Sequence, residues 1–174
     1  MDARSRMTTL TAACLDTPAG PLALVADPDG ALVAAGFCPV ADLEARLHAP
    51  SRPAADLGPL TRAISGYLAG DLAAVDELPV AQPGSPYQQA VWTALRQVPA
   101  GSTISYGALA GRLGRTPGAA RAVGSACGAN LVAPVVPCHR VVRADGTPGG
   151  YYYGVAVKRW LLAHESGAAA AAAG

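Results

Sequence analysis

The sequence predicts an α+β protein in which a small N-terminal antiparallel sheet with helices precedes a mainly helical second half. Three observations support this fold class. Short apolar runs alternate with turn residues at the beginning of the chain, apolar residues recur at helical spacing further on, and a proline-rich stretch near residue 80 separates the two patterns. A chain of 174 residues can form one large domain or two small ones.

In the N-terminal half, residues 1–80, turn-forming residues mark where the predicted strands begin and end. The predicted strands are Thr9–Leu15, Leu22–Ala26 and Leu32–Phe37. Gly20-Pro21 and Asp27-Pro28-Asp29-Gly30 separate them, which favours an antiparallel arrangement. Two helices are predicted after the strands, at Ala41–His48 and Leu60–Ala69. The apolar stripe of the second helix consists of Leu60, Ile64, Tyr67 and Leu68.

The C-terminal half, residues 81–166, begins after a linker predicted from Pro79, Pro83, Gly84 and Pro86. Its predicted helices are Tyr87–Gln97 with Ser85 as N-cap, Ser105–Leu113, Pro117–Ala126 and Ala156–Glu165. The middle two are joined by a tight turn and resemble a helix-turn-helix, whose second helix enters a groove of duplex DNA. Leu131–Val136 is predicted as a buried strand, and the alanine-rich tail 167–174 need not pack.

The composition excludes two broad classes of protein. Hydrophobic residues make up 51% of the chain and charged residues 14%, unlike the composition of disordered chains. No apolar run reaches the roughly 18 to 20 residues needed to cross a bilayer. We expect no secretion signal, because no continuous apolar stretch precedes Asp16. The four cysteines are therefore expected to be reduced thiols of a cytoplasmic protein.

Charge is distributed unevenly between the two halves. Residues 1–80 contain five basic and ten acidic side chains, whereas residues 81–174 contain eight basic and two acidic ones. A basic C-terminal half is typical of proteins that bind a polyanion such as nucleic acid. Two halves that attract each other would show the same asymmetry, so charge alone leaves both interpretations open.

Cys138-His139-Arg140 is the one sequence in the chain that suggests nucleophilic chemistry. Neighbouring positive charge can stabilise a thiolate, which is the reactive form of cysteine. A free cysteine is also commonly a small buried apolar residue, and adjacent side chains do not face each other by default. The residue types alone do not decide between these interpretations.

The wider context of this cysteine resembles a known family. The string Val135–Val142 is similar to the signature of the O6-alkylguanine-DNA alkyltransferases. Four other segments match the same family: Asp16–Leu22, Ile104–Gly107, Ala119–Gly124 with the nearby Asn130, and Lys158–Glu165. The resemblance is dense from about Tyr87 to Glu165. It implies an RNase H-like N-terminal domain and a C-terminal DNA-binding domain that contains the helix-turn-helix.

The resemblance also implies a reaction and a role for each catalytic residue. Cys138 would attack the alkyl carbon on O6 of guanine and be consumed, since a thioether does not return to the thiol. His139 would act as base through a water molecule, oriented by Glu165. Tyr106 would donate a proton or hydrogen bond to the leaving guanine, although a packed core tyrosine is the alternative. O4-alkylthymine is left open as a second substrate.

Double-stranded DNA is the partner that the resemblance implies, bound through the minor groove. The alkylated base must leave the stack to reach a thiol, and Arg121 is expected to fill the gap. The DNA-binding residues implied are Ser105, Ala120, Arg121 and Gly124. The substrate pocket is expected to involve Asn130, Arg140, Val141, Tyr151, Tyr152 and Tyr153, with Asn130 and Arg140 in structural roles.

The chain departs from the family pattern at Tyr152 and Tyr153, which replace small residues, and at Leu131, which replaces a proline. We expect Tyr153 to narrow the pocket mouth and disfavour bulky alkyl groups, unless both rings pack on the surface. Cys127 is expected to pack in its helix. The cysteines and histidines do not have the spacing of a metal site, and the sequence has no glycine-rich phosphate-binding loop. No metal or cofactor is therefore expected.

Two other functions stay open at this point. Alkyltransferase-like proteins bind lesions without transferring the alkyl group, but they replace the acceptor cysteine. A thiol hydrolase using Cys138 and His139 would turn over repeatedly. A monomer is expected in solution.

Overall fold

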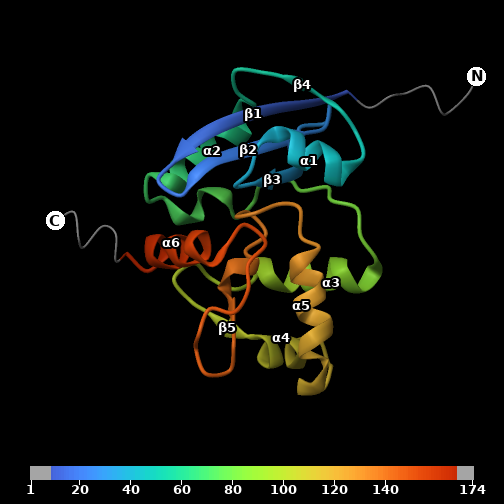
Figure 1. Cartoon of the computed structure of the whole chain (residues 1–174), viewed down its shortest axis with the longest axis vertical. Coiled ribbons are helices and arrows are strands. Elements are labelled where there is room, and N and C mark those ends of the chain that lie inside the picture. Colours follow the sequence, from blue (N-terminus) through green and yellow to red (C-terminus); the bar gives the residue numbers. More distant parts are fainter. Residues whose placement is uncertain (1–8, 168–174) are drawn as a thin grey trace, which may run out of the picture.

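The computed structural model describes residues 9–167 and places an N-terminal sheet over a helical C-terminal half (Figure 1). The basic residues at the N-terminus and the alanine-rich tail lie outside the described residues, apart from Gly167. Buried apolar side chains of both halves form one contiguous core. The division into domains at residue 80 therefore stays a prediction.

The sheet of the N-terminal half has the strand order β3-β2-β1-β4. Its strands are β1 (Leu10–Thr17), β2 (Gly20–Ala26), β3 (Leu32–Gly36) and β4 (Ser51–Pro53). The first three are antiparallel, as predicted, and the β1–β2 turn uses Gly20 at a positive φ that favours glycine. The parallel strand β4 was not predicted, because three residues that include Pro53 show no strand pattern.

The described part of the N-terminal half also contains two α-helices and one 3-10 helix, of which the first contacts the three antiparallel strands. The helices are α1 (Val40–Leu47), α2 (Pro59–Leu68) and the 3-10 helix η1 (Leu72–Val75). The two predicted helices are confirmed within one residue at each end. Helix α2 buries the stripe of Leu60, Ile64 and Tyr67.

In the described part of the chain, the C-terminal half consists of four α-helices, two short 3-10 helices, one pair of two-residue strands and connecting loops. Its elements are α3 (Pro86–Arg96), β5 (Ile104–Ser105), α4 (Tyr106–Arg112), η2 (Pro117–Ala119), α5 (Ala120–Gly128), η3 (Cys138–Arg140), β6 (Val141–Val142) and α6 (Val155–Glu165). Helix α3 begins with the predicted N-cap, where Ser85 and Gln88 form a capping box. Helices α4 and α5 contact each other at the end of the molecule away from the sheet (Figure 1).

The segment Leu131–Val136 is not the predicted strand. It is buried as expected, but its backbone turns, and only Val132 forms an isolated bridge with Ala35. Pro134 and Pro137 lack an N–H group, so the segment cannot form a continuous ladder. Its polar backbone groups bond instead to β3 and to the side chain of Asn130.

The stretch predicted as a linker is fixed to the fold at its start. Leu32 donates to the carbonyl of Pro79, and Ala81 donates to the carbonyl of Leu32. The next residue, Gln82, is buried and bonds to the C-terminal half: its Nε2 donates to Asn130 Oδ1 and its Oε1 accepts from the Leu131 amide. Residues 79–82 therefore connect the sheet directly to the loop that precedes Cys138.

None of the helices within residues 9–167 is long and apolar enough to cross a membrane.

Replacing Gln82 by leucine removes both hydrogen bonds and leaves the Leu131 amide and Asn130 Oδ1 buried without these partners. We expect a loss of about 1–3 kcal/mol in the free energy of unfolding, measured by urea denaturation. Gln97→Leu is the control, because Gln97 is exposed and should stay within about 0.5 kcal/mol of the wild type. Equal stabilities for the two variants would contradict the structural role of Gln82.

Candidate active site

Cys138 lines a pocket of about 190 Å³ between the helix pair α4–α5 and the loop that precedes α6. The lining residues are Tyr106, Gly124, Cys127, Gly128, Cys138, Gly150, Tyr151 and Tyr152. Tyr106 begins α4, and three lining residues come from α5. The pocket thus lies between the helices α4 and α5 and the Cys138 thiol.

The Cys138 thiol is buried beside hydrogen-bonding and charged groups. Its Sγ accepts a hydrogen bond from Asn130 Nδ2 at 3.3 Å. Burial raises the pKa of Cys138, and although this hydrogen bond and the charge of Lys158 act in the opposite direction, they do not cancel the effect. The thiol is therefore protonated at neutral pH, and nucleophilic attack needs a base.

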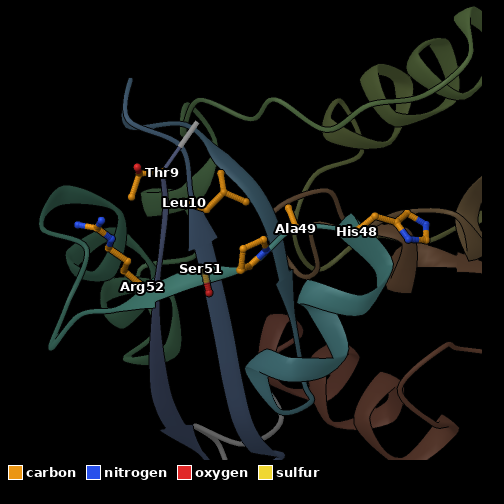
Figure 2. Close-up of a pocket in the computed structure, with 7 residues that line it drawn as sticks. Thr9, Leu10, His48, Ala49, Ser51 and Arg52 are labelled. Carbon is orange, nitrogen blue, oxygen red and sulfur yellow. The ribbon is translucent and has the colours of Figure 1, made fainter. Parts of the chain in front are cut away.

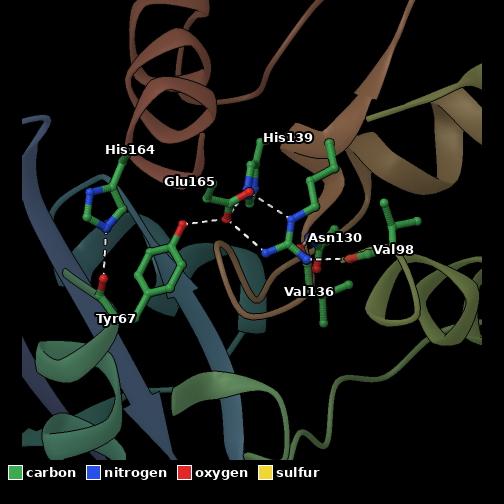
Figure 3. Close-up of polar contacts among 8 residues, drawn as sticks. Tyr67, Val98, Asn130, Val136, His139, His164 and Glu165 are labelled. Carbon is green, nitrogen blue, oxygen red and sulfur yellow. Dashed lines mark hydrogen bonds and ion pairs between the residues drawn. The ribbon is translucent and has the colours of Figure 1, made fainter. Parts of the chain in front are cut away.

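A buried network surrounds the neighbouring His139 (Figure 3). Its Nε2 is 2.8 Å from Glu165 Oε2, and Arg140 binds the same carboxylate through Nε and Nη2, each at 2.8 Å. Arg140 Nη1 donates to the carbonyl of Val98 just beyond α3. These side chains come from η3 and α6, so the network holds the two elements together.

The electrostatics of the network define which groups carry charge. Burial by itself raises the pKa of Glu165, but hydrogen bonds from Arg140 and His139 outweigh it and hold the pKa far below its usual value. Burial lowers the pKa of His139, and this effect is larger than the increase that the neighbouring Glu165 causes. The carboxylate is thus ionised and the imidazole neutral at pH 7. The buried His139 Nδ1 has no hydrogen-bond partner in the described part of the chain, so it is free to accept a proton.

Two further buried residues shape the loops around the pocket. Asn130 donates to the Val136 carbonyl at 2.8 Å and accepts from the Val132 amide at 3.0 Å, which fixes the turn before Cys138. Lys158 donates from Nζ to the carbonyls of Val141 and Gly150. These bonds tie α6 to both sides of the pocket loop.

The structure separates the predicted pocket residues into two groups. Tyr151 and Tyr152 line the pocket, whereas Asn130, Arg140, Val141 and Tyr153 are not among its lining residues. The expectation that Tyr153 narrows the pocket mouth does not match this placement. The Tyr153 ring packs against Phe37 and over Gly36, so the bulky side chain fills space beside β3 instead.

The predicted DNA-binding residues lie on or beside α4 and α5. Ser105 is the N-cap of α4, where its hydroxyl accepts from the Ala108 amide. Ala120 and Arg121 begin α5, and Arg121 is exposed. Gly124, one turn further along α5, lines the pocket. The helix that bears Arg121 therefore also forms a pocket wall.

Sequence reasoning missed three residues that the structure brings to the site. Arg46 of α1 lies 3.9 Å over the Tyr152 ring and donates to the Gly128 carbonyl. Tyr67 of α2 donates to Glu165. Lys158 is completely buried. Only Lys158 had a sequence signal, as part of a family-like segment, because the contacts of Arg46 and Tyr67 depend on how the two halves pack.

A larger hollow of about 460 Å³ lies in the N-terminal half, between the start of β1 and β4 (Figure 2). Its lining residues are Thr9, Leu10, His48, Ala49, Pro50, Ser51 and Arg52. It is mostly apolar and contains no cysteine, so it lacks the thiol that would accept an alkyl group. Residues 9–167 also contain no cluster of side chains that could hold a metal ion.

Comparisons with known proteins identify the family of this chain. Residues 86–167 match the family described as 6-O-methylguanine DNA methyltransferase, DNA binding domain. A methylated-DNA–protein-cysteine methyltransferase of Salmonella typhimurium is 46% identical over 157 residues, covering 86% of this chain and 91% of that protein. Its counterpart in Mycobacterium bovis is 41% identical over 158 residues, covering 90% of this chain and 93% of that protein.

Solved structures show the same fold. The O6-methylguanine methyltransferase of Mycobacterium tuberculosis has a TM-score of 0.75 at 35% identity, covering 92% of this chain and 93% of that one. A structure of Mycobacterium tuberculosis OGT in complex with DNA has a TM-score of 0.77 at 36% identity, covering 90% and 92%. This chain belongs to the methylated-DNA–protein-cysteine methyltransferase family.

Proposed function

We propose that this protein repairs alkylated DNA by transferring the alkyl group from O6 of guanine to Cys138, once per molecule. The observation that supports this most directly is the position of the thiol: Cys138 lines the pocket, and the residue after it is a buried histidine paired with a carboxylate. A thiol with an adjacent oriented base is the arrangement that nucleophilic catalysis requires.

The proton and electron movements follow from the protonation states. Neutral His139 accepts the Cys138 proton at Nδ1, through a water molecule, while Glu165 stabilises the imidazolium that forms. The thiolate forms a bond to the alkyl carbon as the bond from that carbon to O6 breaks. Negative charge develops on the leaving guanine, which accepts a hydrogen bond from the hydroxyl of the pocket residue Tyr106. Burial raises the pKa of Tyr106, so its hydroxyl keeps its proton.

Duplex DNA is the proposed partner, bound by the helix-turn-helix formed by α4 and α5 in the minor groove. A stacked guanine cannot reach the pocket, so it must flip out at a cost of a few kcal/mol. Arg121 is exposed on the first turn of α5, the helix that also lines the pocket. From there its side chain is proposed to fill the gap left in the stack. We propose that one monomer binds each lesion.

Intact-protein mass spectrometry after incubation with duplex DNA containing O6-methylguanine tests the proposed transfer. We expect the wild type to gain the mass of one methylene group and Cys138→Ser to gain nothing, because a hydroxyl is a far weaker nucleophile than a thiolate. Cys127→Ser removes the other thiol of the pocket and is expected to keep the gain. Methylation mapped to Cys127, or several equivalents of product per protein, would contradict the proposal.

The pocket wall predicts how the protein selects alkyl groups. Tyr152 lines the pocket with 59% of its surface exposed and is held by Arg46, so we propose that Tyr152 rather than Tyr153 limits alkyl size. Tyr152→Ser is expected to raise the ratio of benzyl to methyl transfer rates about tenfold, because the wall is removed. Tyr153→Gly is expected to change this ratio less, because the Tyr153 ring does not line the pocket and acts on it only through its edge contacts with Tyr151 and Tyr152. Rates on both DNA substrates check this, and a ratio that responds only to Tyr153→Gly would reverse the assignment.

A further inference from the structure

One side chain of the N-terminal half reaches the catalytic network. Tyr67, in α2, donates from its hydroxyl to Glu165 Oε2 at 2.6 Å (Figure 3). Both side chains are buried, and Tyr67 has no exposed surface. The two residues are 98 positions apart in the sequence, so this contact exists only when the halves are packed together.

The oxygen that Tyr67 binds is the one that orients the proposed base. Glu165 Oε2 accepts from Tyr67, from Arg140 Nη2 and from His139 Nε2, while Oε1 accepts from Arg140 Nε. Burial and the negative charge of Glu165 both raise the pKa of Tyr67 well above its usual value. The phenol therefore stays a hydrogen-bond donor across the working pH range of the protein.

Helix α6 fixes Tyr67 at both ends of the residue. The Tyr67 side chain binds Glu165, and the Tyr67 backbone carbonyl lies 2.8 Å from Nε2 of His164, the residue before Glu165. The rings of Tyr67 and His164 pack edge to face at 5.3 Å, and the Trp160 ring stacks on His164. The hydroxyl is thus held toward Glu165 by packing on α6.

We infer that Tyr67 is a positioning residue for the alkyl transfer: its hydroxyl holds Glu165 so that the carboxylate keeps the proton of His139 on Nε2 and leaves Nδ1 as the acceptor. This role rests on the proposed function. It assigns a task in the reaction to the N-terminal half, which otherwise contributes Arg46 over the ring of the pocket residue Tyr152.

The hydrogen bond also has an electrostatic consequence. A donor on Oε2 withdraws negative charge from the carboxylate, and loss of that donor leaves more charge facing His139. The other charged groups around His139 are Arg140 and Lys158, which oppose its protonation and do not change in a Tyr67 variant. Loss of the hydroxyl should therefore favour the imidazolium, and the transfer rate should begin to fall at a higher pH than in the wild type.

The test is the single-turnover methyl-transfer rate constant of the full chain at saturating O6-methylguanine duplex, measured across pH. The amplitude of the reaction reports the fraction of folded protein, whereas the pH at which the rate constant falls reports the protonation of the base. For Tyr67→Phe we expect about a tenfold lower rate constant at pH 7.5, because Glu165 loses one of the hydrogen bonds that hold it. We also expect the acid limb of the pH profile, where the rate constant falls as the base is protonated, to move to higher pH. Tyr87→Phe is the matched control, since the buried Tyr87 hydroxyl has no partner in the described residues.

A second variant keeps the test decisive if Tyr67→Phe folds poorly. Site-specific replacement of Tyr67 by 3-fluorotyrosine retains the ring and strengthens the donor, so the acid limb should move to lower pH. Rate constants within about twofold of the wild type together with an unmoved acid limb in both variants would overturn the inference. A wild type that transfers no methyl group would overturn the proposed function as well, which separates the two failures.

Discussion

The buried carboxylate of Glu165 is the constraint on which the rest of the site depends. An ionised carboxylate inside a protein is strongly unfavourable unless it is paired and fully hydrogen-bonded. Here Arg140 supplies the countercharge through two parallel hydrogen bonds, and His139 and Tyr67 complete the set. The donors come from η3 and α2, and the acceptor lies on α6. Satisfying one charge therefore fixes the relative positions of three elements and both halves of the chain.

Burial sets the chemistry of the site as well as its geometry. It raises the pKa of Cys138 and lowers that of His139, so the resting pair is a neutral thiol beside a neutral imidazole. A buried protonated thiol reacts slowly with small electrophiles and oxidants. This suits an acceptor that is used once. In the proposed reaction, His139 takes up the thiol proton and Glu165 stabilises the resulting charge.

Much of this arrangement could be predicted from local sequence patterns. The antiparallel strands, the helices α1 to α3 and the N-cap at Ser85 follow from turn and capping chemistry that acts over a few residues. The string around Cys138 indicated the family. The segment before it was wrongly expected to be a strand, because apolar character does not show that prolines and Asn130 impose a turn. Tyr67 looked like one more apolar residue on a helix stripe, since its partner Glu165 is distant in sequence and close only after folding.

The protonation state of His139 is the central claim, and NMR of the protein labelled with nitrogen-15 at histidine tests it most directly. The ring nitrogen shifts report both the tautomer and the pKa. A titration of the free protein should show His139 neutral at pH 7 with its proton on Nε2, and a pKa below the usual 6.5. A His139 that is charged at pH 7, or that carries its neutral-state proton on Nδ1, would contradict the account, because it could not accept the Cys138 proton.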